Sequence, residues 1–95
     1  MKEKTESPKI SRKILIVEDE PALLAILVDK LTREGFTAIG AKDGQEGLKM
    51  AIKDHPDLIL LDIIMPVMDG MIMLSELRKD RWGRSVLVVL LTNLS

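Results

Sequence analysis

Acidic side chains follow two short apolar stretches of the sequence, and their types and spacing suit the binding of a metal ion. Glu18 and Asp19 come directly after the stretch Ile14–Val17. Asp62 follows the stretch Leu58–Leu61 in the same way. An unbroken run of valine, isoleucine and leucine is typical of a parallel strand buried on both faces. Since sites in open α/β sheets form outside the carboxyl ends of such strands, we expect these carboxylates to meet at one edge of a sheet.

Carboxylates at close quarters repel one another, and a divalent cation reverses that repulsion. Mg²⁺ takes about six oxygen ligands, commonly a few carboxylates together with waters and phosphate oxygens. The chain has no cysteine and one histidine, so the ligand set favours Mg²⁺ or Mn²⁺ over zinc. An aspartate beside such a metal can also act as a nucleophile and form an aspartyl phosphate. Thr92, at the end of a later apolar stretch, would place a hydroxyl near the new phosphoryl group.

Length and composition indicate one small domain without a general affinity for nucleic acid or membrane. The chain has 95 residues, of which 46% are hydrophobic, and a formal net charge of −1. Such a balanced charge gives no overall attraction to DNA or to an acidic membrane. The lack of cysteine suits a reducing cytoplasm, and no apolar stretch approaches the roughly 20 residues of a membrane span. We predict a cytoplasmic domain over residues 13–95, preceded by a flexible tail over residues 1–12.

The chain from residue 13 onward alternates strand and helix patterns, which is typical of a parallel sheet with crossover helices. Strands are predicted over residues 13–18, 36–41, 57–62 and 86–91. The strand at 36–41 mixes polar with apolar residues and contains a glycine, so an edge position is expected for it.

Helix signals stand between the predicted strands. Pro21 suits the first turn of a helix, and Gly35 suits a left-handed stop after it. Asp43 and Glu46 resemble a capping box at the start of a second helix, which His55 and the proline after it would end. A third helix is expected after Gly70. The predicted inward residues of the three helices are Leu24, Leu27, Val28 and Leu31, then Leu48, Ala51 and Ile52, then Leu74 and Leu77.

The acidic motifs and their surroundings resemble the receiver domain of bacterial two-component response regulators. The stretches that carry the resemblance, in the family's order and separations, are residues 14–20, 43–44, 60–66, 69–70 and 90–92. The resemblance implies an α/β, flavodoxin-like, doubly wound parallel sheet with strand order 2-1-3-4. It also implies that this sequence is C-terminally truncated relative to the family. The fourth helix, the fifth strand with its phosphate-binding lysine, and the fifth helix would all be absent.

By the same resemblance, Asp62 is expected to be the phosphoacceptor. Glu18 and Asp19 are expected to hold Mg²⁺ together with Asp62 and the backbone carbonyl of Ile64. Thr92 is expected to be the switch hydroxyl. The family takes its phosphoryl group from a sensor histidine kinase or from a small donor such as acetyl phosphate, and then acts on an output domain or partner. The resemblance therefore implies a phosphoacceptor domain rather than an enzyme, with no nucleic acid or membrane bound by the domain itself.

The missing family elements keep a second function open, that of an interaction or assembly domain that binds metal but is not productively phosphorylated. The predicted strand at 86–91 would then be an exposed edge of six apolar residues, and such an edge is a template for pairing with another chain. We expect self-association through this strand or through the uncovered face of the sheet.

Two further classes fit the residues less well. Magnesium-dependent phosphohydrolases on a similar sheet use a nucleophilic aspartate with a second aspartate two residues later, and Glu18, Asp19 and Glu20 do not make that pattern. A flavin-binding domain of similar topology needs hydroxyls and backbone donors after its first strand, because carboxylates at that place repel phosphate.

Overall fold

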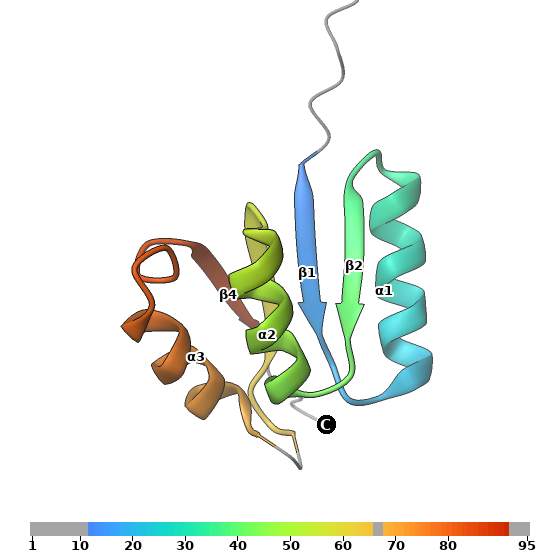
Figure 1. Cartoon of the computed structure of the whole chain (residues 1–95). Helices are drawn as coiled ribbons and strands as arrows, with labels where there is room; N and C mark the ends of the chain where they lie inside the picture. The colour runs from blue at the N-terminus through green and yellow to red at the C-terminus, as the bar shows by residue number, and fades with distance from the viewer. Residues whose placement is uncertain (1–11, 66–67, 92–95) are drawn as a thin grey trace, which may run out of the picture.

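The computed structural model describes residues 12–65 and 68–91, in which strands and helices alternate along the chain (Figure 1). The strands are β1 Lys13–Val17, β2 Thr37–Ala41, β3 Leu58–Asp62 and β4 Leu87–Leu91. The helices are α1 Pro21–Arg33, α2 Gly44–Asp54 and α3 Gly70–Lys79. The strands form one parallel sheet of order β2-β1-β3-β4. This order confirms the predicted flavodoxin-like topology and the edge position of β2.

The two faces of the sheet are covered unequally. On one face, alternate strand residues pack with α2 and α3 in a cluster that includes Leu15, Ile59, Leu61, Met73 and Leu77, each of them fully buried. The other face carries α1, which packs mainly against β2 and β1 (Figure 1). No residue of α1 is fully buried, so this helix covers its half of the sheet only loosely.

The start of each helix is fixed by side-chain acceptors, as the sequence predicts for α2. The Oδ1 atom of Asp43 accepts the Glu46 backbone N–H at 2.8 Å. The Glu46 Oε1 atom accepts the backbone N–H of Lys42 at 2.8 Å, one residue before the cap. The end of α2 is also confirmed, since His55 takes a left-handed conformation with a φ of 48°. Gly35, after α1, has a φ of 100°, which glycine adopts without steric cost.

Two features of the predicted core are corrected by the structure. Ile52 is 40% exposed because α2 turns its small residues, Gly44, Gly47 and Ala51, toward the sheet and α3. Met73 is fully buried in the core cluster, although the sequence pattern gave the inward face of α3 to Leu74 and Leu77. The predicted tail, apart from its last residue, lies outside the described residues. Thr92 and the last residue of the stretch 60–66 also lie outside them.

Candidate functional site

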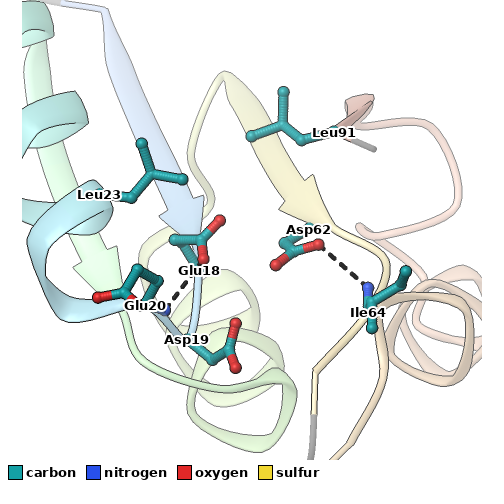
Figure 2. A pocket seen from close by; sticks show the side chains of 7 residues that line it. All are labelled: Glu18, Asp19, Glu20, Leu23, Asp62, Ile64 and Leu91. Atoms are coloured by element: carbon teal, nitrogen blue, oxygen red, sulfur yellow. Dashed lines mark hydrogen bonds between the residues drawn. The ribbon is translucent and has the colours of Figure 1, made fainter. Parts of the chain in front are cut away.

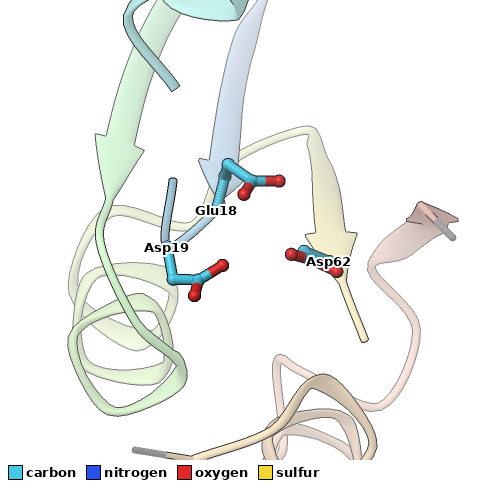
Figure 3. A group of neighbouring side chains, drawn as sticks. All are labelled: Glu18, Asp19 and Asp62. Atoms are coloured by element: carbon cyan, nitrogen blue, oxygen red, sulfur yellow. The ribbon is translucent and has the colours of Figure 1, made fainter. Parts of the chain in front are cut away.

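Three carboxylates meet at the edge of the sheet where β1 and β3 end. Glu18 and Asp19 follow β1 directly, and Asp62 is the last residue of β3. One ligand oxygen from each of them lies within 4.8 Å of the others (Figure 3). The structure therefore brings together the acidic residues that the sequence analysis singled out, from stretches more than 40 residues apart.

The topology of the sheet explains this meeting. The central strand β1 pairs with β2 on one side and with β3 on the other. The chain leaves β1 toward β2, and the later crossover returns to the opposite side to form β3. The strand order thus reverses beside β1, and the helices that flank this point leave a hollow outside the carboxyl ends of the strands.

Backbone donors fix the orientation of two of the carboxylates (Figure 2). The Glu18 Oε2 atom accepts the backbone N–H of Glu20 at 2.9 Å. The Asp62 Oδ1 atom accepts the backbone N–H of Ile64 at 3.1 Å. In each case the donor is the backbone N–H two residues later in the chain, in the segment that follows the strand. This segment therefore sets the orientation of the carboxylate group.

The hollow at the site is open and mainly acidic. It has a volume of about 550 Å³, and its described lining residues are Glu18, Asp19, Glu20, Leu23, Asp62, Ile64 and Leu91 (Figure 2). No lysine or arginine is among these lining residues, within the part of the chain that the structure describes. A cation that entered this hollow would meet carboxylate oxygens without competition from a basic side chain.

Burial and mutual repulsion act on the acids together. Glu18 is 5% exposed and Asp62 is 8% exposed. Desolvation by burial raises the pKa of Glu18, the neighbouring charges of Asp62 and Asp19 raise it further, and the Glu20 N–H offsets part of the rise. A divalent cation would relieve this repulsion, and oxygen ligands are those that Mg²⁺ and Mn²⁺ prefer. The residues present therefore fit such an ion.

The apolar lining of the hollow was not anticipated from the sequence. Leu91 lies beside Asp62 because these two residues are partners in the β3–β4 register. Leu23 comes from the first turn of α1 and is 42% exposed. Helical spacing predicted that other leucines face the sheet from α1. The one signal for a role of Leu23 in the lining of the hollow was its position about one turn after the acidic pair.

Comparison with known proteins gives the same family for most of the chain. The family model described as "Response regulator receiver domain" matches residues 14–95. The alkaline phosphatase synthesis transcriptional regulatory protein PhoP of Bacillus subtilis is 40% identical over 72 residues, which is 76% of this chain and 30% of that protein. The response regulator PleD of Caulobacter vibrioides is 44% identical over 85 residues, which is 90% of this chain and 19% of that protein.

Solved structures show the same fold. The chemotaxis protein CheY4 of Vibrio cholerae superposes with a TM-score of 0.84 at 28% identity, covering 90% of this chain and 71% of that one. The response regulator TrrA of Thermotoga maritima, solved in complex with Mg²⁺ and BeF, gives a TM-score of 0.80 at 36% identity, covering 88% of this chain and 71% of that one.

No helix within the described ranges has both the length and the apolar character needed to cross a membrane. The chain spans less than a third of either curated relative, at 30% and 19% of their lengths. The family match over residues 14–95, the sheet order and the acidic cluster between β1 and β3 all agree. The chain belongs to the response regulator receiver domain family.

Proposed function

We propose that this domain accepts a phosphoryl group on Asp62 in a reaction that depends on Mg²⁺ or Mn²⁺. The observation that carries the proposal is the cluster of Glu18, Asp19 and Asp62 in an open hollow, where one carboxylate oxygen of each residue lies within 4.8 Å of the other two. The TrrA structure with Mg²⁺ and BeF supports the choice of ion and of a phosphoryl-like ligand for a protein of the same family.

The proposed metal ligands are Glu18, Asp19, Asp62 and the backbone carbonyl of Ile64. Bound there, the ion would neutralise the oxygens of the incoming phosphoryl group and lower the repulsion between acceptor and donor. A carboxylate oxygen of Asp62 attacks phosphorus, and the bond from phosphorus to the donor breaks in the same transfer. The donor's imidazole or acetate leaves with that electron pair, and Asp62 becomes an aspartyl phosphate.

The remaining residues have supporting roles in the proposal. The Ile64 N–H holds Asp62 Oδ1 at 3.1 Å, so the carboxylate enters the reaction already oriented. Thr92, which lies outside the described residues, is proposed as the hydroxyl that bonds the new phosphoryl group. The partners proposed are a sensor histidine kinase as donor and an output domain or separate protein as receiver of the signal. A cytoplasmic location remains a prediction from the sequence.

The test is labelling of the intact chain with acetyl phosphate in the presence of Mg²⁺. Wild-type protein is expected to gain one phosphoryl group by mass spectrometry, in an acid-stable and base-labile linkage. Asp62→Asn is expected to gain none. Asp69→Asn is the matched control, because Asp69 caps α3 outside the hollow through a bond from the Ile72 N–H to Oδ1, which asparagine can also accept. This variant should be labelled like wild type.

Two results would redirect the proposal. Labelling of Asp62→Asn at the wild-type rate would remove Asp62 as the acceptor. Wild-type protein that binds Mn²⁺ but takes up no phosphoryl group would favour the alternative function, a metal-binding interaction or assembly domain that is not productively phosphorylated.

A further inference from the structure

Gly44 and Gly70, the first residues of α2 and α3, lie unusually close to backbone atoms near the site. A Cβ atom on Gly44 would lie 2.2 Å from the carbonyl oxygen of Met68. A Cβ atom on Gly70 would lie 2.4 Å from the carbonyl oxygen of Asp62 and 2.5 Å from Ile63 Cα. Gly35 is the glycine with a positive φ among the described residues, so Gly44 and Gly70 are required for close approach rather than for backbone conformation.

The two close contacts form one continuous row. Met68 and Gly70 are separated only by Asp69, which caps α3 through its Oδ1 atom and the Ile72 N–H at 2.9 Å. Gly70 also donates its backbone N–H to the Ile63 carbonyl at 3.1 Å. The start of α3 is therefore held on one side by α2 and is in contact on the other side with the backbone of Asp62.

The start of α2 is itself rigidly placed. The Asp43 carboxylate caps its first turn at 2.8 Å, and Gly47, one turn later, lies close to Val17 at the end of β1, where a Cβ would come within 2.7 Å of a valine methyl. The helix thus bridges the strand that precedes Glu18 and the segment that supports Asp62. A small displacement of this helix start would change the spacing of the two halves of the acidic cluster.

We propose that Gly44 is a positioning residue for the acidic site, acting through Met68 and Gly70 on the backbone of Asp62. This inference rests on one part of the proposed function, namely that the acidic cluster binds a metal ion. Gly44 contacts neither the ion nor the phosphoryl group. Its missing side chain lets α2 seat against Met68, and any larger residue pushes the start of α3 outward, together with the backbone that carries the acceptor.

The direct experiment compares Gly44→Ala with Gly83→Ala. Gly83 lies between α3 and the start of β4. Since β4 runs parallel to β3, this segment is at the end of the sheet opposite to the site. A Cβ on Gly83 would meet the Leu77 carbonyl oxygen at the same 2.2 Å. Both variants should lose stability. Mn²⁺ affinity, measured by electron paramagnetic resonance on folded protein, should fall about 10-fold or more in Gly44→Ala, the effect typical of a lost outer-sphere support. It should be unchanged in Gly83→Ala.

A second readout uses metal-free protein. Hydrogen exchange at the amides of Ile64 and Gly70 should be faster in Gly44→Ala than in wild type, and unchanged in Gly83→Ala. If Gly44→Ala does not fold, hydrogen exchange of the wild-type protein with and without Mg²⁺ tests the positioning role instead. Added Mg²⁺ should then slow exchange at Glu46 and Gly47, in the first turn of α2, as well as at Ile64 and Gly70.

The outcomes separate this inference from the proposed function. Wild-type Mn²⁺ affinity and exchange in Gly44→Ala would overturn the positioning role, as would Mg²⁺ protection that stops at Ile64 and Gly70. Wild-type protein that binds no Mn²⁺ would overturn the metal site, and the metal-free exchange comparison would still decide whether Gly44 holds the backbone of Asp62.

Discussion

At the scale of single residues, Glu18 shows how a cluster of acidic side chains can oppose folding. The residue is 5% exposed and lies beside two other acids, and desolvation by burial raises the pKa of its carboxyl group. Because this pKa is higher in the folded than in the unfolded chain, the folded chain binds the proton more tightly. The free energy of unfolding therefore falls as pH rises from the unfolded pKa through the folded one, and the loss persists at higher pH.

Glu18→Gln should raise the thermal midpoint of the metal-free protein at pH 7, because the amide keeps an oxygen for the Glu20 N–H and removes the repelled charge. The gain should disappear near pH 3, below the ordinary glutamate pKa of about 4.3, where both states of the wild-type residue are protonated. Mn²⁺ affinity should fall in the same variant. Calorimetry over this pH range provides the measurement.

Glu34→Gln, at the exposed end of α1, is the control for this substitution and should leave the thermal midpoint unchanged. A lower midpoint for Glu18→Gln at pH 7 would show that the carboxylate stabilises the metal-free fold, contrary to the prediction.

The meeting of the three acids could be predicted from the sequence because the signal for it is local. Glu18, Asp19 and Asp62 each follow an apolar run directly, and the carboxyl ends of parallel strands share one edge of a sheet. Gly44 gave no such signal beyond its place in an Asp-Gly pair. Its reason for being glycine is a contact with Met68, which is 24 positions away in the sequence, from 44 to 68.

At the scale of elements, the segment between α3 and β4 is held by the side chains of Arg78 and Asp80. The Arg78 Nη1 atom donates to the carbonyl oxygens of Gly83 and Val86, each at 2.8 Å. The Oδ2 atom of Asp80 accepts the backbone N–H groups of Trp82 and Gly83, each at 2.9 Å. These bonds fix the turn that leads the chain into β4.

Arg78→Met should lower the free energy of unfolding by about 2–3 kcal/mol, because hydrogen bonds to a charged group contribute about 1.5–3 kcal/mol and the two carbonyls lose their donor. The neighbouring Lys79→Met is the control. Lys79 pairs with Glu76 at 2.8 Å, but their side chains are 68% and 44% exposed, and such pairs contribute at most about 1 kcal/mol. Urea unfolding measures both, and equal losses in the two variants would contradict the role given to Arg78.

The elements themselves were predictable to within a residue at the strand ends, since strand and helix periods are read from neighbouring residues. The inward face of α2 was less predictable. Hydrophobicity favoured Ile52, but α2 approaches its neighbours so closely that its fully buried positions are the small residues Gly44, Gly47 and Ala51. Leu48 and Met50 pack against the core while only partly buried. The distance between two packed elements depends on the side chains of both, so it cannot be predicted from the sequence of one segment alone.

At the scale of the whole molecule, β4 is an edge strand of the sheet within the part of the chain that the structure describes. Leu87 and Val89 pair with Leu58 and Leu60 in the register, and these side chains lie on the face of the sheet that carries α1. The helix α1 covers mainly the β1 and β2 half of that face. Leu87 is 63% exposed and Val89 is 42% exposed. Among the described residues β4 pairs only with β3, so its outer backbone groups suit an added strand.

We therefore expect the chain to self-associate through β4, with the same strand of a second copy as its partner. Val89→Lys should shift the population toward monomer, because a charge at an edge strand opposes pairing. Met71→Lys is the control, since Met71 is 53% exposed on α3 and should leave association unchanged. Sedimentation velocity over a range of concentrations measures the distribution. A wild-type chain that remains monomeric at the highest concentration would contradict the expectation.

The stacked rings of Trp82 and His55, with centroids 4.3 Å apart, give the molecule an optical property. Trp82 is the one tryptophan of the chain. It stacks on His55, the residue that ends α2, and it precedes β4. The parallel strands begin at this end of the sheet, and the acids follow their opposite ends. We expect its emission to change when the stack is lost on unfolding. An ion bound among the carboxylates, at the opposite end of the sheet, should not quench it directly. Fluorescence of this protein should thus report denaturation, and ligand occupancy needs a separate probe.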